Sequence, residues 1–165
     1  MTTLVRTSEQ LVVVERGQFA LCDATAPFDG RPWELPALEG RRIAVNGSGL
    51  TVASTVTMHD ADVRLELWDA PPPAEAGEAP GECVLSVPSG SVTAWSVPHG
   101  PVGEPMALDG PGSYAVRVHR YGGGPRARAR QEAADPPLFT GLESFVIQLW
   151  RHRPPSDGPE GERRR

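Results

Sequence analysis

Apolar and polar residues alternate with a period of two in four segments of the chain. These segments are residues 18–23, 63–68, 113–121 and 143–150. A period of two places one row of side chains in a core and the other row toward water, which is typical of antiparallel strands. Weaker alternation predicts five further strands, at residues 10–14, 41–45, 50–58, 82–87 and 91–97.

Turn-forming residues separate several of these segments. Residues 46–49 (Asn-Gly-Ser-Gly) and 88–90 (Pro-Ser-Gly) each stand between two predicted strands, where we expect hairpin turns. The best helix candidate is short, at residues 127–134, and ends before an Asp-Pro-Pro sequence. Eight or nine short strands favour an all-β fold, a single-domain antiparallel β-sandwich, with a small β-barrel as the alternative.

Glycine and proline set the expected domain boundaries. The chain has 18 of each among 165 residues, and most of them lie in four segments, at residues 70–82, 97–112, 122–137 and 151–165. We therefore expect the sandwich to span residues 10–150 with long Pro/Gly-rich loops. A flexible N-terminus (residues 1–9) precedes it, and a disordered tail rich in proline, glycine and arginine (151–165) follows it.

Charge and apolar content narrow the classes of partner and compartment. The formal net charge is −5, which argues against direct nucleic-acid binding and suits a protein partner with a basic surface. No apolar run approaches the roughly 20 residues that span a bilayer, and the first residues do not form a signal peptide. We therefore expect a cytoplasmic protein with no membrane contact, in which Cys22 and Cys83 are free thiols.

Histidines are the residues from which a catalytic site would have to be built. The candidate bases are His59, His99 and His119. The sequence positions no nucleophile or carboxylate beside His99 or His119, so it names no acid–base pair. His119 shares the polar face of its strand with Arg117 and Tyr121, and we expect that face to be solvated. The sequence therefore predicts no catalytic residue, and an enzyme with a loop-built histidine site remains an alternative.

The most ligand-like cluster begins at His59 and continues through Asp60, Asp62 and Glu66. Its spacing fits neither a zinc site nor a calcium loop, so we expect a polar turn, with no metal and no cofactor. The same region supplies the predicted partner-binding surface, which consists of Asp60, Asp62, Arg64 and Glu66.

Tryptophans support a second kind of binding site. Trp68 and Trp150 each end a predicted strand on the face opposite its main aliphatic row. Together with Trp95 they are candidates for stacking against a sugar or another small ligand. A small-ligand or carbohydrate-binding module is therefore the alternative to a protein-binding domain.

The order of the segments resembles that of a known family. The chain is similar in this order to small β-rich actinobacterial proteins. The segments that carry the similarity are residues 18–23, Trp33 in a loop, a hairpin-rich middle, and the closing runs 112–118 and 143–150. More distantly, they resemble the competence protein J family, whose members inhibit a DNA-entry nuclease. The resemblance spans about residues 11–150 in element order and implies a non-catalytic, nuclease-inhibitor or immunity-type protein. It assigns no inhibitory residue to this chain.

Overall fold

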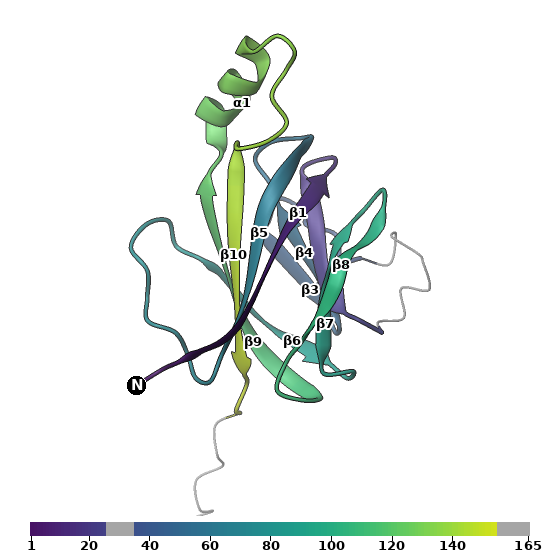
Figure 1. Cartoon of the computed structure of the whole chain (residues 1–165), viewed down its shortest axis with the longest axis vertical. Helices are drawn as coiled ribbons and strands as arrows, with labels where there is room; N and C mark the ends of the chain where they lie inside the picture. The colour runs from purple at the N-terminus through teal and green to yellow at the C-terminus, as the bar shows by residue number, and fades with distance from the viewer. Residues whose placement is uncertain (26–34, 155–165) are drawn as a thin grey trace, which may run out of the picture.

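Two five-stranded sheets make up the protein and form a β-sandwich. A computed structural model of the chain describes residues 1–25 and 35–154. Sheet A has the strand order β1-β5-β10-β9-β6, and sheet B has the order β3-β4-β2-β7-β8 (Figure 1). The sheets stay separate, so the fold is the predicted sandwich and not the alternative barrel.

Nine of the ten described strands lie at or near predicted strands, with shifts at their ends, and the tenth, β8, lies in a predicted loop. Sheet A consists of β1 (Leu4–Val14), β5 (His59–Trp68), β6 (Gly81–Val87), β9 (Gly112–Gly122) and β10 (Glu143–Arg151). Sheet B consists of β2 (Gln18–Asp23), β3 (Ile43–Asn46), β4 (Gly49–Ala53), β7 (Ser91–Ser96) and β8 (Gly100–Ala107). Strand β1 begins well before residue 10, because it pairs with β5 from Leu4 onward.

Sheet A contains one parallel pair among its antiparallel neighbours. Strands β5 and β10 run parallel, from the pair Asp62–Ser144 to the pair Leu67–Leu149. On its other side β10 pairs antiparallel with β9. A parallel pair needs a long crossover, and here β6, β7, β8 and β9 all lie between the two strands in the sequence. The last strand therefore occupies the centre of sheet A.

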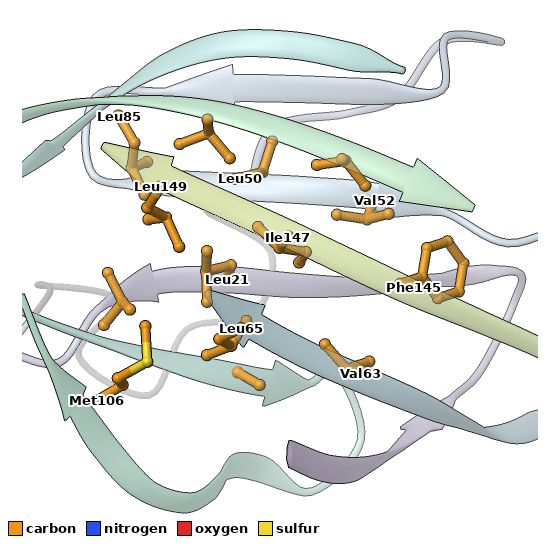
Figure 2. Close-up of a cluster of buried hydrophobic side chains, with 14 of the residues drawn as sticks. Leu21, Leu50, Val52, Val63, Leu65, Leu85, Met106, Phe145, Ile147 and Leu149 are labelled. Atoms are coloured by element: carbon orange, nitrogen blue, oxygen red, sulfur yellow. The ribbon is translucent and has the colours of Figure 1, made fainter. Parts of the chain in front are cut away.

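The core lies between the sheets and is built from the apolar row of each strand (Figure 2). On β10 this row is Phe145, Ile147 and Leu149, each at most 1% exposed. Phe145 meets Phe19 of sheet B edge to face, with ring centroids 4.9 Å apart. The period-two alternation of the sequence thus corresponds to real burial.

Strand β8 replaces part of the loop predicted over residues 97–112. It contains Pro101 and Pro105, which the sequence rules assign to loops. Among the described strands it neighbours β7 alone, so β8 is an edge strand. A proline is tolerated there because an edge strand needs backbone donors on one side alone.

Residues 88–90 do not form the predicted hairpin turn. They lead from β6 in sheet A to β7 in sheet B, so the two flanking strands do not pair. Asp23 anchors this crossing, because the backbone nitrogen and the hydroxyl of Ser89 both donate to its Oδ2 at 2.8 Å. Burial alone would raise the pKa of Asp23, but these bonds and those from Thr25 outweigh it and lower the pKa.

Helix α1 (Gly124–Ala133) projects beyond one end of the sandwich, between β9 and β10 (Figure 1). It begins earlier than the predicted residue 127, because the glycine run bends the chain and Pro125 suits the first helical turn. Ala127 packs with Val56 and Leu142 in a small apolar cluster of its own.

Both cysteines are free, as predicted. Burial raises the pKa of the Cys22 thiol to about 12 and that of Cys83 to about 11. Trp33 and residues 155–165, most of the predicted tail, lie outside the described residues. Within the described part of the chain, no helix has the length and apolar character needed to cross a membrane.

Candidate functional site

Polar side chains of three adjacent strands, β5, β10 and β9, gather on the outer face of sheet A. On β5, Asp62, Arg64 and Glu66 point away from the core, because Val63 and Leu65 between them are buried in it. The predicted partner-binding residues therefore share one face of the sheet. Their surroundings, however, differ from one residue to the next.

Glu66, Gln148 and His119 form a hydrogen-bonded row across the three strands. Parallel pairing sets Gln148 opposite Glu66, and Gln148 Nε2 donates to Glu66 Oε2 at 3.2 Å. His119 Nε2 donates to Gln148 Oε1 at 3.0 Å, since an amide oxygen can only accept. Glu66, Gln148 and His119 are 7%, 1% and 4% exposed. The predicted solvated face at His119 is therefore wrong.

The connection between β5 and β6, residues 69–80, lies against the β9 side of this face. It loops out beside β9 and β10 (Figure 1) and is held to β9 by side chains of the outer face. Arg117 Nη1 donates to the carbonyl of Pro72 at 3.1 Å, and the Tyr121 hydroxyl donates to the Glu75 carboxylate. The outer face is therefore covered on the β9 side and open toward β1.

A groove of about 490 Å³ occupies the open side of this face. Residues of β1, β5 and β10 line it, among them Glu9, Leu11, Asp62, Arg64, Ser144 and Val146. Leu11 is 50% exposed and gives the groove an apolar wall. Two predicted partner-binding residues, Asp62 and Arg64, thus lie in the groove.

Negative charge in and beside the groove is only partly compensated. Arg64 contacts two carboxylates, those of Glu66 at 2.9 Å and Glu9 at 3.3 Å. Within residues 1–25 and 35–154, no arginine pairs with Asp60 or Asp62, and Asp62 is exposed. The open side of sheet A therefore presents free carboxylates next to an apolar side chain.

The three candidate tryptophans divide between the sheets. Trp68 and Trp150 end neighbouring strands on the outer face of sheet A, whereas Trp95 lies on β7 in sheet B. Trp68 Nε1 donates to Glu66 Oε2 at 2.9 Å, and the Arg117 guanidinium lies 5.1 Å from the centre of the Trp150 ring. Trp68 and Trp150 can therefore face one ligand, and Trp95 cannot join them.

The histidines considered as bases lie in three separate places. His99 is exposed in the turn before β8, His119 belongs to the buried row, and His59 begins β5 near α1. They do not converge. Among the described residues, no three His, Cys, Asp or Glu side chains meet as metal ligands do. His59 points into the protein and Asp62 away from it, so the ligand-like cluster of the sequence is divided by the strand itself.

His59 is 1% exposed and lies close to a second buried polar group. Its Nε2 is 2.9 Å from Ser54 Oγ, and its Nδ1 has no hydrogen-bond partner in the described structure. Burial lowers the pKa of His59, and the charges of Glu143 and Asp60 oppose that effect. Glu143 is 2% exposed and accepts hydrogen bonds from the backbone and hydroxyl of Thr55.

We expect the protein to lose stability as the pH falls below about 6.5, in part because of His59. Its folded pKa is lower than the unfolded value, so the unfolded chain binds the proton first and acid favours unfolding. Urea titrations at about pH 7.5 and about pH 5.5 measure this loss. His59→Gln should reduce it by about 1 kcal/mol, and the control His99→Gln should not. Equal losses in the two variants would contradict the prediction.

Gln148 is the residue of this face that sequence reasoning missed. Gln148 shares its strand face with Val146 and Trp150, and the sequence gives it no role beyond that of a polar residue among apolar ones. Its role depends on the strands beside it, since β5 sets Glu66 opposite it and β9 brings His119 within hydrogen-bond distance of its side chain. The single signal in the sequence was the presence of hydrogen-bonding residues on the outer rows of several strands.

Comparison with known proteins shows a likeness of fold. No protein-family model matches the chain, and no curated protein sequence matches it. Among solved structures, ComJ from Bacillus subtilis, described as an inhibitor of the DNA-degrading activity of NucA, superimposes with a TM-score of 0.56 at 11% identity. That match covers 92% of this chain and 99% of ComJ. The product of crocagin biosynthetic gene J matches with a TM-score of 0.55 at 17% identity, over 90% and 100% of the two chains. The distant resemblance to the competence protein J family is thus confirmed at the level of the fold.

Proposed function

We propose that this chain is a non-catalytic binding protein that docks on a basic protein surface and inhibits its partner, in the manner described for ComJ. The observation that carries the proposal is the groove on sheet A, where Asp62 is exposed and has no arginine partner in the described structure. Asp60 stands two residues away on the same strand face and adds a second free carboxylate.

Charge complementarity indicates the kind of partner. A nuclease grips phosphates with Lys and Arg side chains, so the surface it offers to DNA is basic. A surface with free carboxylates is attracted to such a channel at long range and accelerates association. Leu11, exposed in the same groove, supplies the apolar contact that a stable interface also needs.

Two further features support a binding role in the cytoplasm. The candidate bases His59, His99 and His119 lie apart, so they do not assemble an acid–base site. The thiols of Cys22 and Cys83 are free, which suits a reducing compartment.

A charge-reversal experiment tests the proposal. Partners captured by the tagged chain at low salt are identified by mass spectrometry, and the purified partner is assayed for DNA degradation with and without the chain. We expect inhibition, and an affinity that falls as salt is added. The double variant Asp60→Arg/Asp62→Arg should bind the partner at least about tenfold more weakly, mainly through slower association.

A matched variant separates the groove from overall charge. Glu39→Arg/Glu132→Arg makes the same change in net charge at two exposed positions, neither of which lines the groove. It should bind with nearly the affinity of the unchanged chain. Equal weakening by both double variants, or a partner whose DNA-degrading activity the chain does not lower, would refute the proposal.

A further inference from the structure

Strands β5 and β10 finish at the end of sheet A opposite the end that carries α1 (Figure 1). Two adjoining hollows lie at the residues that close these strands. One has a volume of about 330 Å³ and the other about 450 Å³. Asp69, Arg151 and Arg153 line both, so the hollows share a wall. They have no lining residue in common with the groove described above, so occupancy of one does not exclude the other.

Each hollow contains one indole held on the rigid sheet. Trp68 lines the smaller hollow, and Trp150 lines the larger. The hydrogen bond from Trp68 Nε1 to Glu66 and the Arg117 guanidinium over the Trp150 ring fix the two side chains from the side of the sheet. Flat apolar surfaces fixed in this way bind planar groups at a small cost in side-chain entropy.

Positive charge prevails around the smaller hollow. Its lining contains three arginines, Arg6, Arg151 and Arg153, against two aspartates, Asp69 and Asp109. This excess stands out in a chain whose net charge is −5.

The three arginines differ in how far they are engaged. Arg151 is held in place by the carbonyl oxygens of Asp109 and Pro111 and by the Tyr114 ring, 5.2 Å from its guanidinium carbon. Arg6 donates to a backbone carbonyl and forms no ion pair within the described residues. Arg153 has no partner there. Arg6 and Arg153 are therefore available to an incoming anion.

We propose that this region binds a small organic anion with a planar apolar body, such as an aromatic carboxylate or sulfonate. The guanidinium groups match the geometry of an oxyanion, and the indoles match a flat ring. A neutral sugar would use the indoles and leave the arginines without a counter-charge. The charge of the lining therefore favours the anion over the carbohydrate that the tryptophans alone suggested.

A pair of matched fluorescent probes tests this site. 8-Anilinonaphthalene-1-sulfonate is a planar anion, and N-phenyl-1-naphthylamine has the same ring system without the sulfonate. Titration of the full chain should give one saturable site for the sulfonate, with affinity at least about tenfold above that for the neutral amine. Inorganic phosphate, which has no planar body, should compete weakly.

Variants locate the binding. Arg6→Gln/Arg153→Gln should weaken sulfonate binding about tenfold and leave binding of the neutral probe unchanged. Arg126→Gln/Arg128→Gln removes two exposed arginines from α1 and should change neither. Equal affinity for both probes, no binding of the sulfonate, or the same affinity in the Arg6/Arg153 variant would each overturn the proposal. None of these results depends on the partner protein proposed above.

Discussion

Replacing Gly123 by alanine is expected to lower the free energy of unfolding by about 2–4 kcal/mol. Gly123 has a φ of 77°, in the left-handed region that a side chain disfavours. A Cβ there would also overlap the Glu143 carboxylate and lie 2.6 Å from Thr55 Oγ1. Glu143 is 2% exposed and bonded to Thr55, so it cannot move aside without breaking those bonds. Urea denaturation followed by circular dichroism measures the loss.

The neighbouring glycine provides the control. Gly124 has a similar φ of 73°, but nothing lies within 4 Å of a Cβ built on it. Gly124→Ala should therefore lower the free energy of unfolding only through its left-handed backbone conformation, by about 1–2 kcal/mol. If Gly123→Ala proved no more costly than Gly124→Ala, the tight contact between Glu143, Thr55 and the start of α1 would not exist as described.

Gln148→Met is expected to destabilise the protein by about 1–3 kcal/mol. The two side chains have similar shapes, so the packing around residue 148 should be kept, but the bonds to Glu66 and His119 disappear. Both partners are nearly buried, so water cannot fully replace the lost amide. Chemical denaturation at constant pH gives the change in free energy.

Gln18→Met is the matched comparison. Gln18 is half-buried at the start of β2, and its side chain makes no hydrogen bond in the described structure. Its replacement should change stability by less than about 0.5 kcal/mol. Equal effects at the two positions would mean that the buried row contributes nothing beyond the volume of its side chains.

Alternation along the sequence predicts the strands well where one face is apolar. The predicted segment at residues 18–23 coincides with β2, and that at 143–150 falls one residue short of the end of β10. The rule fails at β8, because Pro101 and Pro105 carry a loop signal that an edge strand tolerates. Whether a segment forms a strand depends largely on its own residues, whereas its place at the edge of a sheet depends on the other strands.

The same limit applies to the candidate site. A period of two places Asp62, Arg64 and Glu66 on one face, and the structure agrees. It cannot indicate that Glu66 is buried, because one of the side chains against it is Gln148, from a strand about 80 residues later. Exposure on a sheet face is decided by what lies over it, which no periodicity of the strand itself encodes.

The central place of β10 has a consequence for how the protein is made. Strands β1 and β5 on one side, and β9 and β6 on the other, meet only through β10, which follows all of them in the chain. During synthesis, the edges of β5 and β9 that will flank β10 stay unpaired until residue 151 has left the ribosome. Strands β5 and β10 are also far apart in the sequence. Bringing them together costs loop-closure entropy, which slows the formation of this pair. Sheet A therefore stays incomplete until β10 has been synthesised.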